Sequence, residues 1–212
     1  MSNIIESLNN EIPAHVKLVA VTKGKSQEEI EALIHRGQVY FAENRIQEAE
    51  QKWPDLKIRF PHIKLHLIGH LQSNKVKKAL TLFDVIETID SFKLAKIIAK
   101  EVKVPAEKEF FIQVNIGNEP QKSGVSIEDA PGLINHCREL SLNITGVMGI
   151  APLAVDPMPY FKNLKLLSDK ANLQEVSMGM SDDFRQAIEY GSTEVRLGRI
   201  LFGSEQIKDQ VE

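Results

Sequence analysis

A lysine, a serine and several glycines that share a chemical logic follow apolar stretches of the sequence. Lys23 comes directly after the apolar stretch 17–22 and carries a primary amine, the group that forms a Schiff base with a carbonyl compound. Gly179, Ser181 and Gly198 lie near the C-terminus, in segments where glycines and main-chain N–H groups suit a phosphate. These residue types together indicate Schiff-base chemistry on a phosphorylated carbonyl ligand.

Each of these residues also has a simpler explanation. A lysine that ends a strand is usually only solvated, and Ser181 can cap a helix whose dipole Asp182 and Asp183 complement. Arg196 can belong to a structural salt bridge. A lysine nucleophile must lose its proton, which burial and a nearby cation both favour.

Short stretches rich in valine and isoleucine alternate with amphipathic stretches along the whole chain, which predicts alternating strands and helices. The helix after the first strand opens with a capping box of Ser26 and Glu29. Later helices are expected to be capped by Ser73, by Asp90 or Ser91, and by the segment 126–129. A further helix is predicted at the N-terminus. Strands are predicted at 17–22, 39–42, 65–68, 85–89, 110–114, 144–148, 173–176 and 194–197.

About eight β-then-α units predict one α/β domain over residues 1–212, a (β/α)8 TIM-type barrel with an extra N-terminal helix. A doubly wound sheet shares the alternation, so the count alone leaves it open. In a closed barrel the first strand adjoins the eighth, and functional residues gather at the carboxyl ends of the strands. Lys23 would then lie near the predicted phosphate segments.

Longer stretches of the sequence resemble the pyridoxal phosphate homeostasis protein family. They follow the family's order over almost the whole chain, and the strings IGxLQxNK and SxGMSxD are specific. The matching stretches are 17–23 (KLVAVTK), 41–44 (FAEN), 66–75 (HLIGHLQSNK), 122–124 (KSG), 146–150 (GVMGI), 177–183 (SMGMSDD) and 191–203 (GSTEVRLGRILFG).

The resemblance implies a barrel like the N-terminal domain of alanine racemase, of PLP fold type III, with pyridoxal 5′-phosphate (PLP) held as a Schiff base on Lys23. Ala42 and Arg199 stand where the family usually has glycine and threonine, so a guanidinium and main-chain N–H groups would replace a hydroxyl at the phosphate. The resemblance places Arg196 at the pyridine nitrogen, Asn44 near the ring, Ser181, Gly198 and Arg199 around the phosphate, and Ser177 and Met180 at the same end.

The implied function is PLP homeostasis, with buffering of PLP and its delivery to apo-enzymes and little or no turnover. Arginine only donates hydrogen bonds, so a pyridine nitrogen facing Arg196 stays unprotonated and is a poor electron sink. Racemases of this fold add a catalytic tyrosine from another domain and the partner subunit, whereas Tyr40, Tyr160 and Tyr190 lie on elements not expected to supply it. A weak racemase-like PLP enzyme and a Schiff-base aldolase without PLP remain alternatives.

Composition narrows the class of protein. The 212 residues are 42% apolar and 26% charged with a net charge of −3, which argues against nucleic acid or anionic lipid as a partner. No apolar run is long enough to cross a bilayer, and the six histidines lack metal-ligand spacing. The sequence therefore predicts a cytoplasmic monomer without a metal.

Overall fold

Eight parallel strands form one closed barrel in chain order, β1 through β8, in the computed structural model, which describes residues 2–203. The predicted barrel is confirmed, and the doubly wound alternative is excluded because β1 pairs with β8. The strands are β1 Lys17–Val21, β2 Tyr40–Glu43, β3 Lys64–Leu67, β4 Val85–Ile89, β5 Glu109–Val114, β6 Ile144–Gly149, β7 Glu175–Ser177 and β8 Glu194–Leu197.

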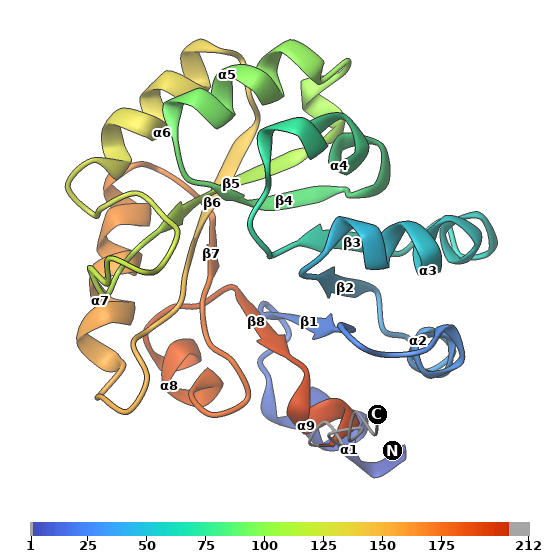
Figure 1. Cartoon of the computed structure of the whole chain (residues 1–212). Coiled ribbons are helices and arrows are strands. Elements are labelled where there is room, and N and C mark those ends of the chain that lie inside the picture. Colours follow the sequence, from blue (N-terminus) through green and yellow to red (C-terminus); the bar gives the residue numbers. More distant parts are fainter. Residues whose placement is uncertain (1, 204–212) are drawn as a thin grey trace, which may run out of the picture.

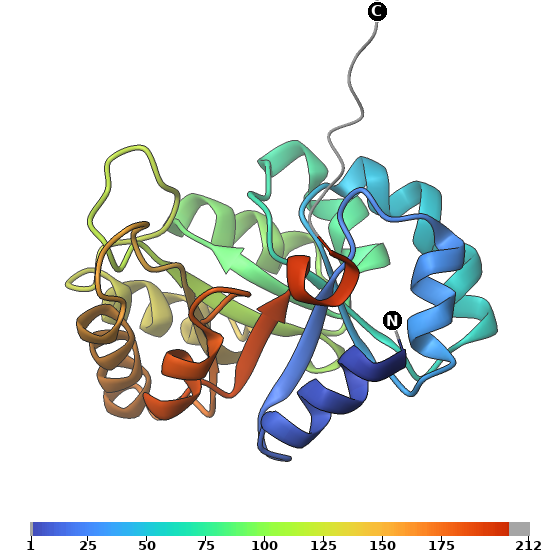
Figure 2. The same cartoon turned by 90° about the horizontal axis from the view of Figure 1, so that it is seen from below.

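Helices surround the strands on the outside of the barrel (Figure 1). The N-terminal helix α1 lies beside α9 in both views, on the side where β1 and β8 meet (Figure 2). No helix within residues 2–203 is both long and apolar enough to cross a membrane. The helices are α1 Ser2–Glu11, α2 Gln27–Ile34, α3 Ile46–Arg59, α4 Val76–Leu82, α5 Phe92–Glu101, α6 Ala130–Glu139, α7 Met158–Lys170, α8 Phe184–Glu189 and α9 Arg199–Phe202, with 3-10 turns η1 Ser73–Lys75 and η2 Pro105–Glu107.

Two of the predicted helix caps are confirmed. The Ser26 hydroxyl accepts from the Glu29 N–H at 3.3 Å, and the Glu29 carboxylate accepts from the Ser26 N–H at 2.8 Å. The Ser91 hydroxyl accepts from the N–H of Leu94 at the start of α5. Both caps satisfy N–H groups that lack partners inside the helix.

Two other caps differ from the prediction. Ser73 does not cap α4, because it begins the 3-10 turn η1, and α4 starts only at Val76. The Ser126 hydroxyl accepts from the Asp129 N–H at 3.0 Å, yet α6 begins after that turn, at Ala130. In both places an extra tight turn separates the capping sequence from the α-helix.

Most buried apolar side chains form one large core between the strands and the surrounding helices. Phe41 of β2, for example, stacks against Trp53 of α3 with ring centroids 5.2 Å apart. A separate small apolar cluster comprises Val85, Phe111 and Met148, on β4, β5 and β6. Other inward strand positions carry the buried charged residues Glu87, Glu194 and Arg196, whereas branched apolar residues usually fill the interior of such barrels.

Gly69, directly after β3, is required by a close approach of two main chains. A Cβ atom at this position would lie 1.9 Å from the carbonyl oxygen of Asn44, the residue that follows β2. Because main-chain atoms cannot move aside as a flexible side chain can, any other residue must displace one of the two segments. Gly69 therefore fixes where Asn44 lies at the carboxyl end of the barrel.

Gly69→Ala tests this contact. We expect the substitution to lower the free energy of unfolding by about 2–3 kcal/mol, because overpacking typically costs 1–3 kcal/mol and the clash is with main chain. Gly132→Ala is the matched control. The nearest atom to a Cβ there is 3.8 Å away, and the residue lies in α6, so alanine should be neutral or stabilise by up to about 1 kcal/mol. Equal thermal unfolding of both variants would contradict the contact.

Candidate cofactor site

Lys23 lies at the carboxyl end of the barrel, two residues after β1. Parallel pairing of Ala20 with Leu197 sets β1 against β8, and a Cβ at Gly198 would lie 3.4 Å from the carbonyl oxygen of Val21. The start of α9 therefore adjoins the segment that carries Lys23. The proximity predicted from barrel closure is confirmed, and the side chain of Lys23 is exposed at this end of the barrel.

Helix α3 holds the main chain on both sides of Lys23. Lys52 Nζ donates to the carbonyl oxygen of Thr22 at 2.8 Å, and Glu48 Oε1 accepts from the N–H of Gly24 at 2.6 Å. Lys52 and Glu48 also pair with each other at 2.8 Å, as residues four apart on one helix can. This pair forms a clamp that fixes the two peptide groups flanking Lys23.

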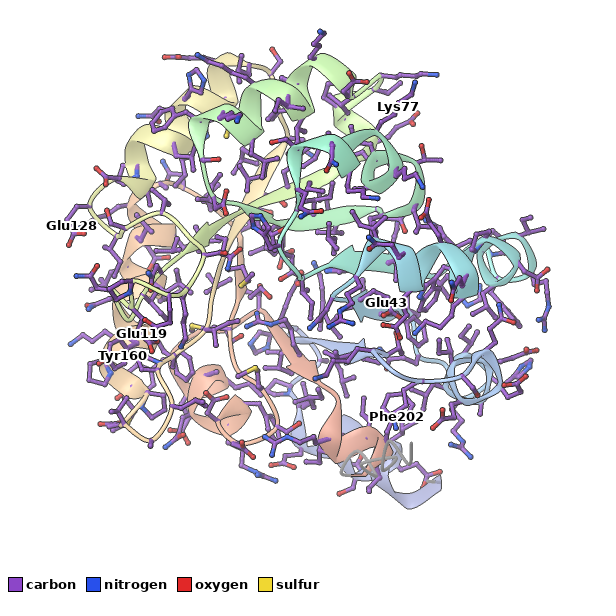
Figure 3. All side chains as sticks on the ribbon, in the orientation of Figure 1. Glu43, Lys77, Glu119, Glu128, Tyr160 and Phe202 are labelled. Atoms are coloured by element: carbon purple, nitrogen blue, oxygen red, sulfur yellow. The ribbon has the colours of Figure 1, made fainter. Side chains whose placement is uncertain are left out.

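The clamp rests on the fully buried carboxylate of Glu43, at the end of β2. Glu43 Oε1 lies 2.7 Å from Lys52 Nζ and accepts from the hydroxyl of Thr22 at 2.6 Å and from Trp53 Nε1 at 3.0 Å. Figure 3 places Glu43 between β2 and α3, outside the barrel interior. One carboxylate thus joins the ends of β1 and β2 to α3.

Asn44 shares a surface depression of about 360 Å³ with Lys23, and Gly24, Arg45 and Glu48 line the same depression. Asn44 is exposed at the carboxyl end of β2, where Gly69 holds its main chain. The structure therefore brings Asn44 and Lys23 together, as the sequence predicts.

Arg196 of β8 is buried, with 3% of its surface exposed. Its Nη1 donates to the hydroxyl of Ser177 at 2.6 Å and its Nη2 to the carbonyl oxygen of Gly149 at 2.9 Å. Burial lowers the pKa of Arg196, and the nearby Glu87 and Glu194 oppose that shift. The guanidinium, 4.0 Å from Glu87, is thus fixed in one orientation by three strands.

The segment after β7 folds back onto the start of α9. Gly179 has φ +95°, and a Cβ there would lie 2.6 Å from the Cβ of Ala187, so this turn requires glycine. The Ser181 hydroxyl accepts from the N–H of Ile200 at 3.4 Å, in the first turn of α9. Ser181 does not cap α8, which begins at Phe184 with no capping side-chain bond, so that simpler explanation is wrong.

Gly198 precedes α9 with φ −121°, a conformation open to any residue, and no neighbour comes closer than 3.4 Å to the position of a Cβ. Packing does not require glycine at this position. The absence of a side chain at Gly198 leaves open space beside Val21. The guanidinium of Arg199 pairs with Asp182 at the exposed rim. Met180 is half-buried and lines a neighbouring depression with the segment 151–157 rather than the one at Lys23.

The donors at these strand ends match the three functional groups of PLP. An amine (Lys23) suits the aldehyde, and a hydroxyl (Ser181) with the open space at Gly198 and the main-chain N–H groups of the first turn of α9 suits the phosphate. The fixed guanidinium of Arg196 suits a nitrogen that accepts a hydrogen bond. The residues present therefore fit the cofactor.

Residues 1–206 match the family model described as alanine racemase, N-terminal domain. The pyridoxal phosphate homeostasis protein of Caenorhabditis elegans is 35% identical over 233 residues, covering 98% of this chain and 96% of the relative. The protein of that name from Synechocystis sp. is 38% identical over 206 residues, covering 91% and 93%.

Solved structures agree with these matches. PipY of Synechococcus elongatus PCC7942, solved with PLP bound, superposes with a TM-score of 0.84 at 32% identity, covering 95% of this chain and 99% of PipY. Alanine racemase of Clostridium difficile 630 shares the fold, with a TM-score of 0.74 at 15% identity, covering 100% of this chain and 59% of the racemase.

The closed barrel and its matches define an alanine racemase N-terminal-domain barrel. Within that class, the chain belongs to the pyridoxal phosphate homeostasis protein family.

Several residues that support the site were not identified from the sequence. Glu48 and Lys52 have the four-residue spacing of a helical ion pair, but the predicted helix after 42 was not followed as far as Lys52. Glu87 and Glu194 lie at inward positions of apolar strands, where a charge is costly. A charged residue within an apolar strand was the available signal in both cases.

Glu48→Ala tests the clamp at Lys23. Loss of a charge-assisted hydrogen bond worth about 1.5–3 kcal/mol should speed amide exchange at Gly24 roughly ten- to a hundredfold, measured by hydrogen–deuterium exchange. Glu50→Ala is the matched control, because Glu50 lies on the same helix but pairs outward with Lys78 at 2.7 Å. Unchanged exchange at Gly24 in Glu48→Ala would refute the clamp.

Proposed function

We propose that this chain holds PLP as a Schiff base on Lys23 and serves PLP homeostasis by buffering the cofactor and delivering it to apo-enzymes. The observation that carries the proposal is the placement of Lys23 beside Gly198 and the first turn of α9, with the fixed guanidinium of Arg196 on β8, the strand that Gly198 follows. The names of the relatives and the PLP-bound PipY structure support it. We further propose that the protein acts in the cytoplasm as a monomer.

PLP, when bound, supplies an aldehyde that condenses with an amine and a conjugated ring that accepts electrons. Lys23 would hold the aldehyde carbon through its amine, and the clamp of Glu48 and Lys52 fixes the main chain of Lys23. Ser181 and the main-chain N–H groups at Gly198 and Arg199 would hold the phosphate, and the Arg199 guanidinium would join them once its pair with Asp182 opens. Arg196, fixed by its bond to Ser177, would donate to the ring nitrogen, Asn44 would flank the ring, and Met180 would lie at the phosphate end.

Low turnover follows from the chemistry of Arg196 and from the positions of the tyrosines. A ring nitrogen that accepts from a guanidinium stays unprotonated, which weakens the ring as an electron sink. Tyr40 lines the opposite, N-terminal end of the barrel, where its ring lies 5.7 Å from Lys17 Nζ. Tyr160 belongs to α7 (Figure 3), and Tyr190 follows α8. None of the three is placed to act as a second acid at Lys23.

Lys23→Ala tests the attachment. We expect the visible absorption band of the wild-type protein incubated with PLP to be lost, while far-ultraviolet circular dichroism stays unchanged because Lys23 is exposed. Lys25→Ala is the matched control, since Lys25 pairs with Glu29 at 3.7 Å and should leave the band intact. A band of normal intensity in Lys23→Ala would exclude Lys23 as the attachment residue, and a wild-type protein without any band would favour the aldolase alternative.

Ser181→Ala and Arg199→Ala, singly and combined, test the phosphate site. A charge-assisted hydrogen bond contributes about 1.5–3 kcal/mol, so each loss should raise the dissociation constant of PLP roughly ten- to a hundredfold. Equilibrium dialysis measures the constant. Arg185→Ala is the control, because Arg185 pairs with Glu11 away from the site. Wild-type retention by the double variant would place the phosphate elsewhere.

Turnover distinguishes a carrier from a weak racemase. The wild-type protein loaded with PLP and incubated with L- or D-alanine in deuterated water should show at most slow exchange of the α-hydrogen by NMR. An ordinary enzyme turns over at about 1 per second or faster. Racemisation at such a rate would establish the racemase alternative.

A further inference from the structure

A chain of charged and polar side chains crosses the barrel interior and ends at Arg196. Each contact is short: Arg196 to the Ser177 hydroxyl at 2.6 Å, that hydroxyl to Glu87 Oε2 at 2.5 Å, and Glu87 Oε1 to His66 Nδ1 at 2.7 Å. His66 Nδ1 lies 3.6 Å from Glu194 Oε2, and Lys17 Nζ reaches Glu194 Oε1 at 3.2 Å and Glu175 Oε1 at 2.7 Å. We name this set the interior chain.

The central members of the interior chain are withdrawn from water. Glu87 and Glu194 are fully buried, and His66 is 1% exposed. Buried charges are costly unless opposite charges balance them. The interior chain contains the carboxylates of Glu87, Glu175 and Glu194 against the cations of Lys17 and Arg196. Neutrality thus requires one further proton, and His66 and Glu194 are the groups placed to carry it.

The environment of these groups puts that proton in the neutral pH range. Burial and the nearby Glu87 raise the pKa of Glu194 to about 7. Burial alone would lower the pKa of His66, but the carboxylates of Glu194 and Glu87 raise it overall. His66 Nε2 and Glu194 Oε2 make no hydrogen bond within residues 2–203, so neither atom is committed to a neighbouring group.

Aromatic, apolar and charged side chains from the surrounding strands line the barrel around the interior chain. Tyr40 of β2 packs edge-on to the ring of His66 with ring centroids 6.1 Å apart, and Phe111 of β5 and Met148 of β6 form an apolar cluster with Val85 of β4. The charged groups are Lys17 from β1, His66 from β3, Glu87 from β4, Glu175 from β7, and Glu194 and Arg196 from β8, with Asp183 acting on Arg196 from the segment after β7.

We propose that Glu194, His66, Glu87 and Ser177 position Arg196 and that Glu194 and His66 share one dissociable proton, so that retention of PLP weakens as the pH rises through neutrality. This inference rests on the proposed PLP function, because Arg196 is the member that meets the ring. Glu194, His66 and Glu87 act through Ser177 and Arg196 and are therefore positioning residues.

A bound metal ion is the competing interpretation. His66, Glu87 and Glu194 offer ligand atoms within 4.8 Å of one another. Lys17 and Arg196 already supply positive charge to the same carboxylates, however, and a divalent ion would add two charges where one proton balances the set. The charge count favours a proton.

The direction of the pH effect follows from the charge that is lost. Glu194 is protonated below a pH of about 7 and ionised above it, so a rising pH adds one negative charge beneath the site. PLP carries an anionic phosphate, and added negative charge lowers the positive potential that favours it. Glu194→Gln is neutral at every pH and should behave like the wild type at low pH.

The test compares dissociation constants of PLP between pH 6 and 8. PLP itself titrates in the presence of every variant. The informative quantity is therefore the ratio of the dissociation constant of the wild type to that of Glu194→Gln, which is expected to rise roughly three- to tenfold over this range. Glu189→Gln, on α8 and exposed, is the matched control and should follow the wild type. Parallel curves for wild type and Glu194→Gln would overturn the proposal, as would a response that disappears after treatment with EDTA.

The proton itself is measured without PLP, by ¹⁵N NMR of the imidazole of His66 in the cofactor-free protein. We expect the midpoint of His66 to lie above the ordinary histidine value of about 6.5, and Glu194→Gln to shift that midpoint by at least half a pH unit. An unaltered midpoint would refute the shared proton, whether or not PLP binds. Failure of PLP to bind, with the NMR shift intact, would instead refute the proposed function.

The positioning role is tested with Ser177→Ala and its conservative counterpart Ser177→Thr. Removal of the hydroxyl breaks the link between Arg196 and Glu87 and should weaken PLP retention roughly tenfold, while threonine keeps the hydroxyl and should restore most of it. Both variants change little volume, so folding is preserved. Equal PLP retention by the alanine variant and the wild type would overturn the positioning role.

Discussion

Parallel pairing of β1 with β8 is the constraint on which the site depends. It closes the barrel and brings Lys23, near the N-terminus, beside Gly198 and α9, near the C-terminus. The register that pairs Ala20 with Leu197 also sets Arg196 opposite Val19, inside the barrel and below the level of Lys23. An open sheet of the same strands would leave the amine and the guanidinium on opposite edges.

Both groups on which the proposed function depends have rigid support. On the outside, Glu48 and Lys52 fix the peptide groups that flank Lys23. On the inside, Ser177 and the carbonyl oxygen of Gly149 fix the guanidinium of Arg196. A preorganised donor that keeps the ring nitrogen unprotonated favours retention over carbanion chemistry. The interior chain then makes that retention sensitive to pH.

The sequence predicted the parts of this structure that depend on local periodicity. Valine- and isoleucine-rich stretches predicted eight strands, and the bounds of β4 and β8 agree with the prediction. The capping box at Ser26 formed because its two partners are three residues apart. The predicted cap at Ser73 was wrong because an extra 3-10 turn precedes α4. The residue types at a cap do not reveal such a turn.

Features that depend on contacts between distant residues were not predictable in the same way. Burial would favour the chemistry of Lys23, yet its side chain is exposed. Glu87 and His66 are 21 residues apart, and Ser177 and Glu87 are 90 residues apart. Pairing of β3 with β4 brings His66 to Glu87, and barrel closure brings Ser177 of β7 to Glu87 of β4. The sequence therefore offered unexplained charges in apolar strands and not the partners that balance them.

A crystal structure of the chain grown with PLP tests the central claim most directly. We predict continuous density from Lys23 Nζ to the cofactor, the phosphate against Ser181 and the first turn of α9, and the ring nitrogen within hydrogen-bond distance of Arg196. PLP attached to another lysine, or a phosphate bound away from Ser181 and Gly198, would contradict the account.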